Sequence, residues 1–207
     1  MRIYLIRHGE SEANHNGIWQ DGHDPLTDRG REQASFLARR VKHFPIDVVI
    51  ASPFVRTRKT AEIILEYLKK PIEWRDDIVE KSTPSEIAGL PRVNPKATEI
   101  LRLTIENSKN PDWRYSDEES YNEFRERARG FLRHLESRTE GHILVVSHGA
   151  YISMLLTIFI FGDDATYEQF GRTFLLFRNK NTGISVLDHD AKNGWVVRTW
   201  NDHTHLN

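Results

Sequence analysis

Three short apolar runs along the chain are each followed at once by polar residues. They cover residues 1–6, 46–51 and 142–146, and each is rich in Ile, Val or Leu with few charges. Runs of this length that do not alternate with polar positions are typical of strands buried on both faces of a parallel sheet. We therefore predict three core strands at these places.

Between the first two runs, and after the second, apolar positions recur at helical spacing. The first helix is expected to begin at Thr27 or Asp28, either of which can act as its cap, and to end before Pro45. The second is predicted to use Ser52 as its N-cap and Pro53 as its first residue. The apolar faces of these two helices consist of Ala34, Leu37, Val41 and Phe44, and of Ala61, Ile64, Leu65 and Leu68.

Two more helices are predicted on either side of the third run. Ser120 and Glu123 have the spacing of a capping box, which opens a long helix that we expect to reach Gly141. A strongly apolar helix should cover about residues 150–161. This alternation of strands and helices favours right-handed parallel β-α units.

The C-terminal part of the chain changes to short β-type runs. They lie at residues 173–178, 183–187 and 195–200, with a hairpin-type turn at 192–194. We interpret them as antiparallel strands added to the edge of the parallel sheet. The predicted fold class is therefore α/β: three α/β/α layers with a mostly parallel central sheet and antiparallel C-terminal edge strands.

Residues 71–116 interrupt this pattern with five prolines and mixed charges. A short helix is predicted at 97–106, where apolar residues again recur at helical spacing. Segments of this kind between core elements often form lids over a site. We expect a single domain over residues 1–207, in which residues 81–116 form a cap-like insertion.

Composition limits the classes of partner. The 207 residues carry a formal net charge of −1, which gives no general attraction to nucleic acid or to an anionic membrane. The chain has no Cys, so disulfides and thiolate catalysis are excluded. Its start resembles no signal peptide, and its most apolar stretch, 152–161, is too short to span a bilayer. We expect a cytoplasmic protein without nucleic-acid or membrane partners.

Charged and nucleophilic side chains follow the predicted strands. Arg7 and His8 come after the first run, His148 after the third, and Arg56 lies one helical turn beyond the second. The ends of neighbouring parallel strands meet in one pocket. Two guanidiniums and two imidazoles require a polyanion, and a phosphoryl group fits because Arg offers paired donors to its oxygens.

Such a pocket can support covalent chemistry. A neutral imidazole can attack phosphorus, the cations can stabilise the transferred group, and a protonated carboxyl can supply the leaving oxygen with a proton. Simpler interpretations remain open at this point. A His at a strand end is often a hydrogen-bonding loop residue, and Arg56 with Arg58 could form a solvated helix face. No dinucleotide fingerprint, P-loop or Gly-x-Ser-x-Gly motif is present.

At this level of detail the chain resembles the histidine phosphatase superfamily, also called phosphoglycerate-mutase-like. The matching blocks occur in the family's order and span nearly the whole predicted core. They are Arg7-His8-Gly9-Glu10-Ser11 with Asn14, Leu26-Thr27 with Gly30 and Gln33-Ala34, Ala51-Ser52-Pro53 with Arg56-Thr57 and Thr60-Ala61-Glu62, Glu80, and Val146-Ser147-His148-Gly149.

The resemblance implies a role for each matching residue. His8 would be the nucleophile that becomes phosphohistidine, and Glu80 would be the general acid toward the leaving group. The side chains that hold the phosphoryl group would be Arg7, Asn14, Arg56 and His148. The family requires no metal and no nucleotide, so the resemblance implies that no cofactor is needed.

Two stretches depart from the family pattern. Lys81–Ser85 stands where the family usually has a Gly- and Trp-containing stretch, so three other acids remain alternatives for the proton donor: Glu10, Asp21 and Glu86. The loop 19–24 also lacks the usual Gly-containing pattern, which leaves the substrate side of the pocket undetermined.

The resemblance leaves three functions. The first is a phosphatase that hydrolyses a small phosphorylated metabolite through phosphohistidine on His8. The second is a mutase that transfers the phosphoryl group between hydroxyls of a phosphoglycerate, although a chain of 207 residues is closer in length to the small phosphatases. The third is a non-catalytic phospho-ligand binder, which the intact set of motif residues disfavours. Oligomeric state is open, with a homodimer through the C-terminal β runs as one alternative.

Overall fold

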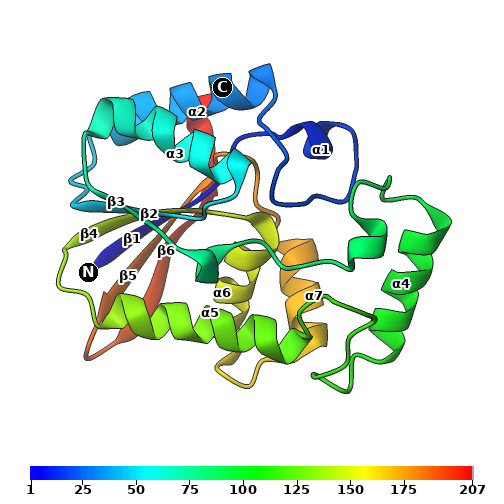
Figure 1. Ribbon diagram of the computed structural model, residues 1–207. Coiled ribbons are helices and arrows are strands. Elements are labelled where there is room, and N and C mark those ends of the chain that lie inside the picture. Colours follow the sequence, from blue (N-terminus) through cyan, green and yellow to red (C-terminus); the bar gives the residue numbers. More distant parts are fainter. Residues whose placement is uncertain (207) are drawn as a thin grey trace.

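The computed structural model describes residues 1–206, and Figure 1 shows a central sheet between two layers of helices. The sheet has six strands in the order β3-β2-β4-β1-β5-β6. Their bounds are β1 (Arg2–Arg7), β2 (Val48–Ala51), β3 (Ile72–Trp74), β4 (His142–Ser147), β5 (Ile184–Asp190) and β6 (Gly194–Asp202).

The first four strands are parallel, and the last two are antiparallel. β4 pairs in parallel with both β1 and β2, and β3 pairs in parallel with β2. β5 runs antiparallel to β1, and β6 antiparallel to β5. The predicted fold class is confirmed. The sequence pattern missed β3, because this edge strand has three residues, none of them fully buried.

Helices cover both faces of the sheet. In Figure 1, α2 and α3 lie on one face and α5 and α6 on the other, with α7 against α6. The helix bounds are α1 (Glu12–His15), α2 (Asp28–Val41), α3 (Val55–Leu68), α4 (Pro95–Glu106), α5 (Tyr121–Glu136), α6 (Gly149–Phe161) and α7 (Tyr167–Leu176).

β1 shows why its residues are apolar at consecutive positions. Ile3 and Leu5 enter the core beneath α5 and α6, whereas Tyr4 and Ile6 enter the core beneath α2 and α3. Successive strand side chains point to opposite faces, and here both faces are covered. Burial of each such side chain contributes about 1.5–3 kcal/mol, so β1 is a firm support for whatever follows it.

Two predicted helix boundaries are wrong. Ser52 does not cap α3, which begins at Val55 after Phe54, a residue without a side-chain capping bond. The Ser52 hydroxyl instead forms a hydrogen bond with the ring of His148. α5 opens with the predicted Ser120–Glu123 capping box, but it ends at Glu136 because the chain turns at Ser137, before Gly141.

The predicted strand at residues 173–178 is also wrong, because most of this segment belongs to α7. Thr166 and Gln169 form a capping box that starts the helix there. Phe170 and Thr173 are its buried residues, three positions apart on one helical face. The run of apolar residues that resembled a strand is the exposed C-terminal part of this helix.

The segment 81–116 lies at the right of Figure 1. It contains α4, close to the predicted short helix. Ile87, Ala97 and Ile100 form a small core of their own with Trp19 packed against it. Two backbone hydrogen bonds tie this segment to the loop that follows α1: the Trp19 N–H donates to the Leu90 carbonyl at 2.9 Å, and the Gly89 N–H donates to the Trp19 carbonyl at 3.0 Å.

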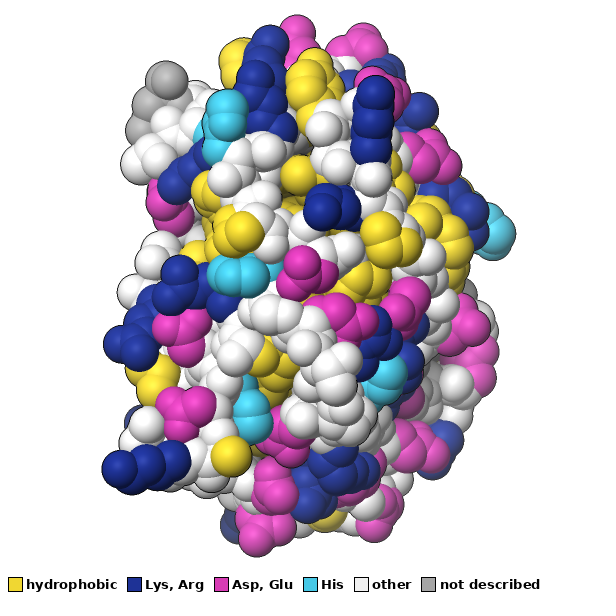
Figure 2. Space-filling view, turned by 90° about the vertical axis from the view of Figure 1, so that its left-hand side faces the viewer, with side chains coloured by type: hydrophobic (Ala, Val, Ile, Leu, Met, Phe, Trp, Pro, Cys, Tyr) yellow, Lys and Arg dark blue, Asp and Glu magenta, His cyan; other side chains and the backbone are white. Residues whose placement is uncertain are grey.

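The described surface carries mixed charge. On the face turned to the viewer in Figure 2, basic and acidic side chains alternate without a large area of one sign. This agrees with the net charge of −1. Within residues 1–206, none of the helices combines the length and the apolar character that crossing a membrane requires.

Candidate active site

The predicted site residues meet where β1, β2 and β4 end. These strands are neighbours in the sheet, and Arg7 at the end of β1 lies opposite Ser147 at the end of β4. The imidazoles of His8 and His148 are fully buried, with ring centroids 5.3 Å apart. Arg56, from the first turn of α3, is 1% exposed and contacts His8. Three segments far apart in sequence therefore form one cationic cluster.

Hydrogen bonds fix the orientation and tautomer of His8. Its Nδ1 lies 2.6 Å from the Gly9 carbonyl, which can only accept, so Nδ1 carries the proton. Its Nε2 lies 3.2 Å from the Nε–H of Arg56, which can only donate. Burial and the nearby Arg56 and Arg7 hold the pKa of His8 well below its ordinary value. His8 is thus a neutral imidazole whose Nε2 lone pair faces the Arg56 guanidinium.

His148 is held by a residue that the sequence assigned to another task. Its Nε2 lies 2.8 Å from the Ser52 hydroxyl at the end of β2. Phe54 packs against the ring edge-on, with centroids 5.3 Å apart. In the described part of the chain, Nδ1 of this buried ring has no hydrogen-bond partner. Burial, followed by Arg56, holds the pKa of His148 well below its ordinary value.

Arg7 is anchored by the backbone after α7. Its Nη1 donates to the Asn179 carbonyl at 2.7 Å, and its Nη2 lies 3.5 Å from Oδ1 of Asn14. Asn181 donates to that same Asn14 oxygen and to the His8 carbonyl. Burial lowers the pKa of Arg7 to about 10.

The sequence pattern had assigned no role to Asn179 or Asn181, although both contact the site residues. Residues 179–183 read Asn-Lys-Asn-Thr-Gly, a cluster of turn-forming residues, which marks a loop. Because a strand was wrongly predicted at 173–178, this loop was expected between two strands at the sheet edge. It lies beside His8 instead.

Glu80 lies at the N-terminus of α6. Its carboxylate accepts hydrogen bonds from the backbone N–H groups of Lys81, Ala150 and Tyr151 at 3.1–3.3 Å. The positive end of the helix dipole favours a carboxylate there. Its charge raises the pKa of Arg7 and of Arg56, against the larger effect of burial, so it belongs to the same electrostatic cluster.

The segment before Glu80 is fastened by α5. Arg127 donates to the carbonyls of Asp77, Val79 and Glu80, and it makes two hydrogen bonds to Glu119 at 2.7 and 3.1 Å. We call these five bonds the Arg127 clamp. The sequence pattern had assigned no role to Arg127.

The alternative acids lie in different places. Asp21 lines the same cavity as Glu80. Glu10 instead accepts from the Thr27 hydroxyl at 3.0 Å, at the start of α2. Glu86 accepts from the Ser116 hydroxyl at 2.8 Å on the surface.

A cavity of about 310 Å³ adjoins the cluster. Its lining includes Arg56, Phe54 and Glu80, together with the start of the segment 81–116. The remaining lining residues are Gln20, Asp21, Gly22, Val79, Lys81, Ser82, Thr83, Ala88, Glu119 and Arg127.

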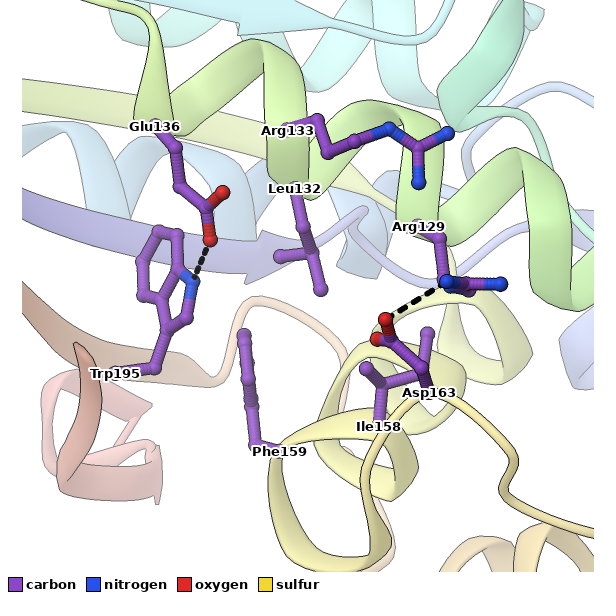
Figure 3. A pocket seen from close by; sticks show the side chains of 8 residues that line it. All are labelled: Arg129, Leu132, Arg133, Glu136, Ile158, Phe159, Asp163 and Trp195. Carbon is purple, nitrogen blue, oxygen red and sulfur yellow. Dashed lines mark hydrogen bonds and ion pairs between the residues drawn. The ribbon is translucent and has the colours of Figure 1, made fainter.

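A second cavity, of about 390 Å³, lies at the other end of the molecule. Figure 3 shows Leu132, Ile158 and Phe159 among its lining residues, between the hydrogen bond of Glu136 with Trp195 and the ion pair of Arg129 with Asp163. His148 is the N-cap of α6 and Phe159 lies near the end of that helix, so about 15 Å of helix separates His148 from this second cavity. The candidate site is therefore the smaller cavity.

The structure describes no group of three or more His, Asp or Glu side chains over residues 1–206 that could hold a metal ion.

Comparison with known proteins decides the family. The model of the histidine phosphatase superfamily (branch 1) matches residues 3–203. The chain belongs to this superfamily. The resemblance seen in the motif blocks is thereby confirmed.

The curated relatives of this chain carry two kinds of name. "Uncharacterized phosphatase PhoE" of Bacillus subtilis (strain 168) is 31% identical over 99% of the chain and 96% of the relative. "Probable phosphoglycerate mutase GpmB" of Photorhabdus laumondii is 33% identical over 100% of the chain and 95% of the relative. These names support an enzyme that acts on phosphate esters.

Solved structures share the fold over their whole length. The α-ribazole phosphatase of Shigella flexneri has a TM-score of 0.80 at 26% identity, over 98% of the chain and 97% of that structure. Phosphoserine phosphatase of Entamoeba histolytica, solved with 3-phosphoglyceric acid, has a TM-score of 0.80 at 22% identity, over 100% and 99%. At that identity the second likeness concerns the fold alone.

Proposed function

We propose that this superfamily member is a metal-independent phosphatase that hydrolyses a small phosphorylated metabolite through phosphohistidine on His8. The observation that carries the proposal is the hydrogen bonding of His8. A proton on Nδ1, held by the Gly9 carbonyl, leaves the Nε2 lone pair as the nucleophile. The depressed pKa keeps this nitrogen unprotonated at neutral pH.

In the first step, Nε2 of His8 forms a bond to phosphorus while the ester P–O bond breaks. Arg7, Arg56, His148 and Asn14 hold the phosphoryl oxygens. Two guanidiniums in a buried site stabilise the charge on these oxygens far more than they would in water. The protonated carboxyl form of Glu80 gives its proton to the leaving oxygen and becomes the carboxylate.

In the second step, Glu80 takes a proton from water as the water attacks phosphorus. The P–Nε2 bond breaks, inorganic phosphate leaves and the imidazole is neutral again. The start of the segment 81–116 forms part of the wall where the leaving group lies, which supports its assignment as a cap.

Mutase activity is the second candidate, because some relatives at 30–33% identity carry a mutase name. The two functions differ in whether water or a second hydroxyl takes the phosphoryl group from His8. We would follow 3-phosphoglycerate in EDTA by ³¹P NMR. Release of inorganic phosphate supports the phosphatase, and appearance of 2-phosphoglycerate supports the mutase. The proposal would be contradicted if 3-phosphoglycerate gave neither product and no other phosphate ester released inorganic phosphate.

A further inference from the structure

The cavity next to His8 contains a cation that the proposed chemistry does not use. Lys81 follows Glu80 directly and lines the cavity together with Arg56 and Arg127. It stands where the sequence departs from the family pattern. Its role therefore has to be inferred from its own surroundings.

The ammonium of Lys81 has only weak partners in the protein. Its Nζ lies 3.4 Å from the Ser82 carbonyl and 3.5 Å from the Glu119 carbonyl. Of the carboxylates that the structure describes, none lies within salt-bridge distance of this ammonium. The two neighbouring cations do have such partners, since Arg56 lies 4.0 Å from Asp24 and Arg127 lies 2.7 Å from Glu119. Burial lowers the pKa of Lys81, which reflects the cost of keeping a cation there.

The nearest acids are already occupied. Both oxygens of Glu119 accept hydrogen bonds from Arg127, and one also accepts from the Ser82 N–H. Glu80 accepts hydrogen bonds from three backbone N–H groups. An ammonium has three N–H donors, and its two long carbonyl contacts leave capacity for a stronger acceptor.

We propose that Lys81 binds a carboxylate of the substrate, at a distance from the phosphoryl group, and so selects phosphorylated carboxylic acids. This rests on the proposed function, which places the phosphoryl group at His8. Arg56 both contacts His8 and lines the cavity. A substrate whose phosphoryl group lies at His8 therefore extends along the wall that carries Lys81. A single ammonium matches one carboxylate, whereas a second phosphate favours the paired donors of arginine.

The rest of the cavity fits a short polar chain. Ser82 and Thr83 contribute hydroxyl groups beside Lys81, and Phe54 and Val79 contribute apolar wall. A volume of about 310 Å³ is at the small end of ligand sites, which suits a metabolite of a few carbons.

The test compares two esters that differ only in the distal group. 3-Phosphoglycerate ends in a carboxylate, and glycerol 3-phosphate ends in a hydroxymethyl. The unaltered enzyme should prefer phosphoglycerate in kcat/KM by at least tenfold. Lys81→Met should lose about 10- to 100-fold on phosphoglycerate, mainly through KM, and less than threefold on glycerol 3-phosphate. Lys81→Arg should restore part of the preference.

Lys59→Met on the surface of α3 is the matched control for the loss of one positive charge, and it should change neither ester. Equal losses on both esters in Lys81→Met, or no preference in the unaltered enzyme, would overturn the assignment. Calorimetric binding of 3-phosphoglycerate to His8→Ala, with and without Lys81→Met, gives the same comparison without turnover. Lys81-dependent binding in a protein that hydrolyses no ester would refute the proposed function while supporting the role of Lys81.

Discussion

The backbones of Gly9 and Gly30 meet directly behind His8. A Cβ atom on Gly9 would lie 2.5 Å from the Gly30 carbonyl oxygen, and one on Gly30 would lie 2.0 Å from the carbonyl oxygen of Glu10. Because both obstacles are backbone atoms, neither can rotate away. The first turn of α2 therefore packs against the segment whose Gly9 carbonyl orients the His8 ring.

Gly30→Ala should disturb this contact. We expect a loss of about 3 kcal/mol in the free energy of unfolding, because overpacking against backbone forces the helix away. Turnover should fall by more than tenfold as His8 loses its orientation. Gly171→Ala on α7 is the control, since a Cβ there meets nothing within 4 Å. Urea unfolding and aryl phosphate turnover of both variants check this, and equal behaviour would show that the contact is not needed.

Ser52→Ala should free the ring of His148. The hydroxyl is the partner of Nε2 inside a fully buried pocket, and loss of such a bond costs about 1–3 kcal/mol. We expect turnover to drop about 10- to 100-fold while the fold persists. Ser35→Ala, on the exposed face of α2, should leave turnover unchanged. Full activity in Ser52→Ala would show that turnover does not depend on the hydrogen bond between Ser52 and His148.

Stability should fall as the pH drops below 6.5. His8 and His148 are neutral in the folded protein because their pKa values are depressed, whereas in the unfolded chain they bind protons near pH 6.5. The unfolded state then holds more protons below pH 6.5, so each histidine removes about 1.4 kcal/mol of stability per pH unit until its folded pKa is reached.

His148→Gln should reduce this slope between pH 6 and pH 5 by about 1.4 kcal/mol per unit. Urea unfolding in acetate and MES buffers measures it, without phosphate or sulfate, because a bound anion would raise both pKa values. His43→Gln, at an exposed position, should keep the slope of the unaltered protein. An identical slope in all three proteins would contradict the burial of neutral imidazoles.

The Arg127 clamp should matter through Glu80. Arg127→Met should slow hydrolysis of an alkyl phosphate about 10- to 100-fold but that of p-nitrophenyl phosphate much less, because nitrophenolate leaves without a proton. In a Glu80→Gln background the same change should cost less than twofold, since the proton donor is already absent. Arg129→Met, two residues further along α5, is the control. Additive losses would show that Arg127 acts independently of Glu80.

Much of this arrangement was predictable from sequence because of local signals. Continuous apolar runs identified β1, β2 and β4, and the residues after each run formed the cationic cluster. The Ser120–Glu123 capping box opened α5 as expected. These features depend on neighbours within a few positions, so a single sequence contains them.

Other features depend on contacts between distant segments. Ser52 precedes a helix and has the composition of a cap, yet its hydroxyl bonds to His148, 96 positions away. Arg127 resembles any solvated arginine on a helix, and only the packing of α5 beneath Glu80 makes it a clamp. β3 and the loop around Asn181 have no apolar periodicity, so tertiary pairing alone defines them.

The central claim is that His8 carries the phosphoryl group. Rapid mixing with an aryl phosphate in EDTA, an alkaline quench and peptide mass spectrometry would detect it, because phosphohistidine survives base and is lost in acid. We predict a phosphoryl group on the peptide that contains His8, formed within one turnover and absent in His8→Ala. Turnover without any such intermediate, or full activity in His8→Ala, would contradict the account.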